Sequence, residues 1–319
     1  MVRRFLPVLY SMLLLPLCGC TDVRERLSPD VLAVDLHRGG TAEFAVRCAQ
    51  APEEPLRASG DSPLMLCTAL RAASGKEIDA GHISLLLLRG DPAEILPDYL
   101  AMQVLMPTGA VLVCRDAPAA HIGYDPAQLR AAADAGMLPV RTADLILGDL
   151  QNGSGISAVP YLCGDTLTLA LCGGEGFPML SADACRGLAL LGGRYQTFAF
   201  RAGDTAAEVK RTHLRITAAE DGGSLHFMLA GTVTCKPEGI PAAGWLDAAQ
   251  SALDRMLTAA CTEPLDLGGA DLLLLRETAV RDGISGAANC TNAEWRDRLL
   301  YADFSVEAAA EPASRADIG

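Results

Sequence analysis

The chain has 319 residues, of which half are hydrophobic and only 5% aromatic, and its formal net charge at pH 7 is −13. This length suffices for two or three domains, with cores built mainly of Leu, Ala and Val. So acidic a surface is repelled by nucleic acid and by anionic lipid head groups, which excludes nucleic acid as a partner and excludes a basic membrane-binding patch.

Residues 1–19 have the pattern of a signal peptide. Arg3 and Arg4 form a short positive region, and an apolar run with two prolines follows over 5–17. A membrane-spanning helix needs about 20 apolar residues, and this run is shorter. The pattern therefore predicts an export segment that is removed.

The end of this segment resembles the lipobox of bacterial lipoproteins. Leu17 stands three positions before Cys20, and the small residue Gly19 stands directly before it. Cleavage is expected between Gly19 and Cys20, with a diacylglycerol joined to the Cys20 thiol. Two acyl chains hold a protein stably on a membrane, at about 0.8 kcal/mol per buried methylene. The alternative is that Cys18 and Cys20 are a chance pair in an ordinary secretory peptide.

A predicted N-terminal α/β domain, 20–153, follows the signal peptide. Its centre reads as a βαβ unit, because two short apolar runs flank a segment with the length of a crossover helix. The hairpin before this unit is expected to turn at Gly39-Gly40, with Val31 and Ala33 on the same side as Phe44, Val46 and Cys48. The predicted elements are the hairpin 31–48, a proline-rich loop 52–63, helix 64–73, strand 85–88, helix 92–106, strand 110–114, and helices 126–135 and 142–151.

Asn152-Gly153-Ser154-Gly155 reads as a linker, followed by a small β-rich middle domain, 154–203, and a C-terminal α+β domain, 204–319. The predicted elements are strands 158–162 and 166–171, a short helix or turn 181–191, strand 195–200, a hairpin 214–233 that turns at 221–223, helices 245–261 and 271–280, and strand 304–310. The fold class is thus α+β or mixed α/β with several domains, in which mixed sheets are flanked by helices and a C-terminal antiparallel sheet packs with helices.

The sequence lacks the familiar catalytic motifs, and no catalytic, cofactor-binding or metal-binding residue is predicted. The five histidines are scattered. His82 directly precedes a buried strand, and we interpret it as a structural residue rather than a proton acceptor. Gly173-Gly174-Glu175-Gly176 is interpreted as a turn rather than a phosphate cradle, and the adjacent Glu53 and Glu54 as part of a solvated loop.

Nine cysteines remain after the predicted cleavage, and they show no C-x-x-C pair or metal-ligand spacing. They are Cys48, Cys67, Cys114, Cys163, Cys172, Cys185, Cys235, Cys261 and Cys290. Most have apolar neighbours, which favours buried thiols over a disulfide framework. Free thiols in an exported protein suggest a reducing habitat as a hypothesis.

Several segments together resemble the Ger(x)C family, the lipoprotein C subunits of the germinant receptors of endospore-forming bacteria. The family opens with a lipid-modified cysteine followed by Trp-Asp and an Arg-Glu pair, and this chain has Cys20, Thr21, Asp22, Arg24 and Glu25. The other matching segments are 31–35, 75–83, 85–88, the helix 245–261, the turn 266–268, Trp295 and 304–319. The departures are Thr21 where a tryptophan is usual, a shorter middle region, and no clear lysine in the strand pair around 165–171.

The resemblance implies a three-domain, non-enzymatic subunit of a nutrient-sensing complex, required for germination. Its partners would be the membrane, through the lipid on Cys20, and the integral-membrane A and B receptor subunits, at the outer face of the spore inner membrane. One alternative is a lipid-anchored solute-binding protein of a transporter, although the chain has few aromatic residues to line a cleft. A surface hydrolase is disfavoured by the missing motifs.

Overall fold

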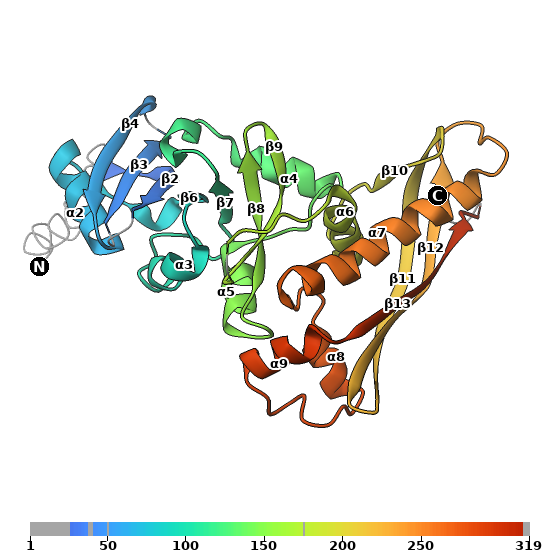
Figure 1. The fold of residues 1–319 in the computed structure, drawn as a ribbon. Helices are drawn as coiled ribbons and strands as arrows, with labels where there is room; N and C mark the ends of the chain where they lie inside the picture. The colour runs from blue at the N-terminus through green and yellow to red at the C-terminus, as the bar shows by residue number, and fades with distance from the viewer. Residues whose placement is uncertain (1–25, 38–40, 50, 175, 315–319) are drawn as a thin grey trace, which may run out of the picture.

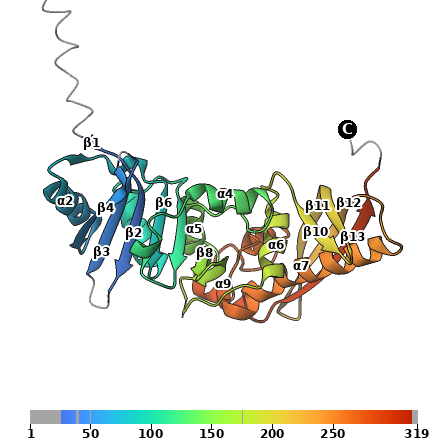
Figure 2. The same cartoon turned by 90° about the horizontal axis from the view of Figure 1, so that it is seen from above.

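The computed structural model describes residues 26–314, apart from 38–40, 50 and 175. Two sheets lie toward opposite ends of an elongated molecule (Figures 1 and 2). The larger sheet has seven strands in the order β4-β3-β2-β6-β7-β8-β9, with parallel pairs at its centre and antiparallel pairs toward both edges. Its strands are β2 (Pro29–Leu36), β3 (Ala42–Cys48), β4 (Ala51–Gly60), β6 (Leu85–Arg89), β7 (Ala110–Cys114), β8 (Ser157–Cys163) and β9 (Thr166–Cys172).

The central strands are buried on both faces, as the run of four leucines in β6 predicts. Leu32 on β2 pairs with Val46 on β3, so these two side chains share a face. Val31 and Ala33 lie on the opposite face, in a different apolar cluster. The predicted hairpin is therefore confirmed, but its assignment of sides was wrong, because apolar residues on both faces hide the alternation.

Helices cover both faces of this sheet. Three helices pack with β2, β6 and β7 in one cluster, and α4 packs on the other face. The helices are α2 (Pro63–Ser74), α3 (Pro92–Ala101) and α5 (Ala143–Gln151) on the first face, and α4 (Pro126–Asp134) with the short helix η4 (Pro118–His121) on the second. The unit β6-α3-β7 is parallel, as predicted. Helix α3 ends at Ala101 instead of Met106, because Gln103 adopts a left-handed φ of 57°.

The predicted loop 52–63 is wrong over most of its length, since 51–60 form the edge strand β4. This strand pairs with β3 through Val46 and Leu56 and through Phe44 and Ala58. Proline lacks the N–H that an inner strand must donate, but an edge strand tolerates it. Pro52 and Pro55 therefore do not prevent a strand at this place in the sheet.

The sheet also runs through the predicted boundary at 153/154. Strand β8 pairs in parallel with β7, through Tyr161 with Val113, and β9 follows β8 as an antiparallel hairpin. The strands predicted for a separate middle domain therefore extend the N-terminal sheet. After them comes α6 (Ala182–Gly192), where a helix or turn was predicted.

The second sheet has the order β10-β11-β12-β13, with one long helix, α7 (Trp245–Gly268), packed on it. Its strands are β10 (Ala199–Ala202), β11 (Thr205–Asp221), β12 (Ser224–Pro237) and β13 (Asp303–Pro312). Gly222 and Gly223 form the two-residue turn of the predicted β11-β12 hairpin. The last strand is parallel to β12, so the expectation of an antiparallel sheet was wrong at this position.

Two short helices lie between α7 and β13, namely α8 (Leu275–Arg281) and α9 (Asn292–Leu299). Helix α9 was not predicted. It begins with a capping box, in which Thr291 accepts from the Glu294 amide and the Glu294 side chain accepts from the Thr291 amide. This T-x-x-E spacing is a readable helix-start signal. Taken together, the elements confirm the α+β, mixed-sheet fold class.

Candidate functional site

The predicted lipidation and cleavage residues, Gly19 and Cys20, lie outside the described residues. The described chain starts at Arg26, in the two-residue strand β1 (Arg26–Leu27), which pairs in parallel with β5 (Glu77–Ile78). The backbone of Leu27 also accepts a hydrogen bond of 2.8 Å from the Asp79 amide. The first described residues are thus held against the body of the protein.

The other sequence candidates do not come together. His82 lies in the short helix η3 (Ala80–His82), with its side chain two-thirds exposed and its Nε2 atom 3.5 Å from the Asp79 carboxylate. Glu54 is exposed on the edge strand β4, and the side chain of Glu53 lies outside the described part of the structure. Among the described residues, no group of three or more metal-binding side chains is present.

The glycine-rich segment after β9 is used in packing. The Gly173 amide, in a left-handed backbone conformation with φ of 88°, donates a hydrogen bond of 3.2 Å to Oδ2 of Asp91. The other oxygen of Asp91 accepts from the Ala93 amide at the start of α3. The first glycine of the motif thus links β9 to α3, and Glu175 lies outside the described residues.

The nine cysteines in the described part of the chain are free thiols, and six of them are buried: Cys48, Cys114, Cys172, Cys185, Cys235 and Cys261. Burial away from water disfavours the thiolate and raises the pKa of Cys114, Cys172, Cys235 and Cys261 to about 12. Such thiols behave as small apolar side chains and are poor nucleophiles. The buried six agree with the sequence interpretation, whereas the reducing habitat stays a prediction.

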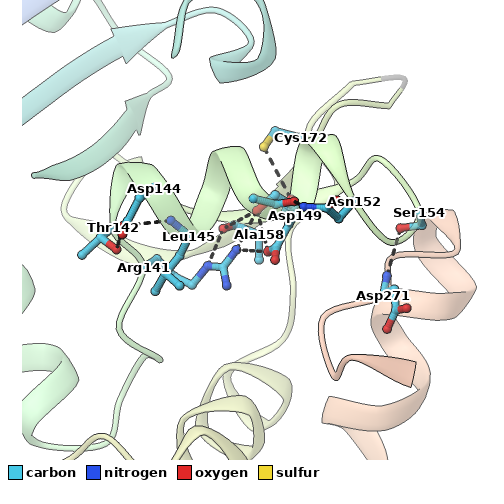
Figure 3. Close-up of polar contacts among 12 residues, drawn as sticks. Arg141, Thr142, Asp144, Leu145, Asp149, Asn152, Ser154, Ala158, Cys172 and Asp271 are labelled. Atoms are coloured by element: carbon cyan, nitrogen blue, oxygen red, sulfur yellow. Dashed lines mark hydrogen bonds and ion pairs between the residues drawn. The ribbon is translucent and has the colours of Figure 1, made fainter. Parts of the chain in front are cut away.

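A partly buried polar network holds the end of α5 against β8. The Arg141 guanidinium donates to the Asp149 carboxylate, to Oγ of Ser157 at 2.6 Å and to the Ala158 carbonyl at 2.9 Å (Figure 3). Ser157 is fully buried and also donates to Asp149, at 3.0 Å. Because each charged group has a partner of opposite charge, the network positions α5 and leaves little free charge.

The predicted linker is packed against the C-terminal half of the chain. Ser154 is buried, and its Oγ atom accepts a hydrogen bond of 3.0 Å from the Asp271 amide, 117 residues later (Figure 3). The Asn292 side chain donates to the Gln151 carbonyl at 3.0 Å. The segment 151–154 therefore belongs to a joint between the two halves, although its composition is that of a flexible connection.

A cleft lies beside this joint, between the two sheets. It has a volume of about 760 Å³, within the range of ligand pockets. Its walls are the segment 138–141, the C-terminal end of α6, strand β11 and the segment 272–281. Leucines from several walls form its apolar part. Its charged lining residues are Arg141, Arg194, Arg215, Arg281 and Glu277, of which Arg141 is paired with Asp149 and Arg281 with Asp282. The scattered origin of these residues explains why no sequence motif marks the cleft.

Comparison with known proteins supports the fold. No protein-family model matches this chain, and no curated protein matches it in sequence. The crystal structure of the GerBC protein is similar to this chain with a TM-score of 0.55 and 13% identity, over 89% of this chain and 97% of that chain. The chain has a Ger(x)C-like fold. In the described part of the chain, no helix has both the length and the apolar character needed to cross a membrane.

Proposed function

We propose that this chain is a lipid-anchored, non-enzymatic subunit of a spore nutrient germinant receptor complex that is required for germination. The observation that carries the proposal is the likeness to the GerBC structure over 89% of the chain. The lipobox-like residues 17–20 support it from the sequence, as do the segments that resemble the Ger(x)C family and follow one another in the same order. The proposed partners are the integral-membrane A and B receptor subunits.

The proposed anchor restricts where the folded body lies. Arg26 is the sixth residue after Cys20, and an extended chain spans at most about 3.6 Å per residue. Strand β1 would then lie within about 20 Å of the lipid surface. Confinement to this layer raises the effective concentration of the subunit near its partners, so modest interfaces suffice for assembly.

The test is to replace the acylated cysteine in the native host. Cys20→Ala should release the protein from washed membranes and impair germination with nutrients. Cys18→Ala is the matched control, because it removes a neighbouring thiol but keeps the position that is acylated. If Cys20→Ala protein stayed on membranes and germination were unimpaired, the anchored role would be refuted.

The alternative of a solute-binding protein receives less support. Such proteins have two similar α/β lobes around a cleft, whereas this chain has a seven-stranded and a four-stranded sheet of different topology. If small nutrients raised the melting temperature of the purified chain, this alternative would be supported.

A further inference from the structure

Strand β11 has an edge over 210–215 that no other described strand covers. Strand β10 pairs with it only over Thr205–Glu208, and the Val209 amide makes a last hydrogen bond of 2.8 Å to the Phe198 carbonyl. A β-bulge at Lys210 follows, where the register against β12 shifts. Beyond the bulge, β11 has β12 on one side, and its other edge lines the cleft between the sheets.

The contacts of α8 show which backbone groups face this edge. Arg281 donates to the Ile216 carbonyl at 2.7 Å, and Asp282 accepts from the Ala218 amide at 2.8 Å. Alternate residues of a strand direct their backbone groups to the same edge. The N–H and C=O groups of Thr212 and Leu214 therefore also point away from β12. In the part of the chain that the structure describes, neither backbone makes a hydrogen bond outside the β11-β12 ladder.

The two sides of this edge differ in chemistry. Thr212, Leu214 and Ile216 turn their side chains toward α7, on the side of Leu229 and the leucines of the cleft. His213 and Arg215 are exposed on the opposite side of the sheet. An added strand would thus meet the apolar side chains of Leu214 and Ile216 on one face and the Arg215 guanidinium on the other.

Two arginines of the cleft lining are not neutralised by other described residues. Arg194 and Arg215 are exposed residues of the cleft lining, and neither makes an ion pair or a hydrogen bond with another described residue. The charge of Arg215 contributes least among the causes that lower the pKa of Asp282. In a protein with a net charge of −13, this local excess of arginine attracts acidic groups.

We propose that the free edge of β11 at 212–215 binds an extended segment of a partner protein as an added strand. The segment would alternate apolar side chains, which enter the cleft, with acidic side chains, which face Arg215. Main-chain hydrogen bonds to Thr212 and Leu214 would provide affinity, and the alternating pattern would provide specificity. This inference rests on the cleft alone and does not depend on the lipid anchor.

The first test uses synthetic peptides of about seven residues and measures binding to the purified chain by fluorescence anisotropy. A peptide of alternating Glu and Leu should bind, and one of alternating Lys and Leu should bind at least about tenfold more weakly. No binding of the acidic peptide at about 1 mM, or equal binding of both, would overturn the proposal.

Backbone N-methylation tests for the added strand itself. In antiparallel addition the leucine N–H groups of the peptide face β11, and in parallel addition the glutamate N–H groups do. One of the two methylated peptides should therefore lose binding. If both bound as well as the parent, the cleft would be an anion site without strand pairing, and the proposal would fail.

Two further measurements locate the site. Arg215→Glu should weaken binding of the acidic peptide about tenfold, whereas Arg57→Glu, the same charge change on the distant strand β4, should not. In the free protein the amides of Thr212 and Leu214 should exchange hydrogen faster than those of His213 and Arg215, and they should become protected when the acidic peptide binds. Equal protection of all four in the free protein would show that the edge is already covered.

Discussion

The indole Nε1 of Trp295 donates a hydrogen bond of 2.8 Å to Oδ2 of Asp271, and both residues are buried. The same carboxylate accepts from the amides of Leu275 at 2.6 Å and Arg276 at 2.9 Å. Because the Asp271 amide also contacts Ser154, one aspartate joins α8, α9 and the connection between the two sheets. This joint sets the relative position of the walls of the cleft.

Removing the indole donor should weaken the joint. Trp295→Phe keeps most of the aromatic volume but leaves Oδ2 of Asp271 with one partner fewer, in a site that water does not reach. We expect a loss of about 1–3 kcal/mol in the free energy of unfolding, measured by urea denaturation. Trp245→Phe is the matched control, because Trp245 is half-buried and its indole N–H has no partner among the described residues. If both variants lost the same free energy of unfolding, the smaller side-chain volume would explain the loss and the hydrogen bond would not.

Asp271 should also make stability depend on pH. Burial raises the pKa of its carboxyl group, an effect that the three donated hydrogen bonds oppose. The folded state then binds the proton more tightly than the unfolded state does, so the free energy of unfolding decreases as pH rises from the ordinary aspartate range through the raised pKa. Asp271→Asn should remove this decrease.

The control for this pH effect is Asp282→Asn. A side-chain hydrogen bond from Arg281 and a backbone one from the Ala218 amide lower the pKa of Asp282 to about 2. Its contribution to stability is therefore lost as pH falls below the ordinary aspartate range toward 2, and the variant should keep the decrease that occurs above that range. An Asp271→Asn protein with an unchanged pH profile would contradict the role given to burial.

The cysteines should separate into two reactivity classes. Thiols with a pKa of about 12, such as Cys172 and Cys261, are thiolates to only about one part in ten thousand at pH 8. In the native protein, maleimide should first label the half-buried Cys67, Cys163 and Cys290, and the other six should react after denaturation without a reductant. If these six cysteines reacted with maleimide only after a reductant had been added, they would be disulfides and not free thiols.

Helices α6 and α7 approach each other closely at Gly187. A Cβ atom at this position would lie 2.1 Å from the Met256 carbonyl oxygen and 2.7 Å from Cβ of Ala260. Gly187→Ala should therefore lower the free energy of unfolding by about 1–3 kcal/mol, because backbone has to shift. Gly192→Ala, in the same helix with open space around it, should be neutral or stabilising. Equal melting temperatures for the two variants would contradict this close packing.

Local patterns determined much of this protein. Leu85–Arg89 is a buried strand because its leucine run is apolar to both sides, and Gly222-Gly223 is a hairpin turn because both positions need a positive φ. The capping box that starts α9, Thr291 with Glu294, is equally local. In each case the interactions that decide the structure lie within a few residues.

The tertiary structure decided what depends on distant partners. The prolines of 51–60 predicted a loop, but β3 offers hydrogen bonds that turn the segment into an edge strand. The parallel pairing of β13 and the closeness of Ser154 to Asp271 depend on segments that are about 80 and 117 residues apart. No short-range pattern records such neighbours, because contact is made only when the two sheets have packed. The open edge of β11 follows for the same reason, since composition does not show where a covering strand stops.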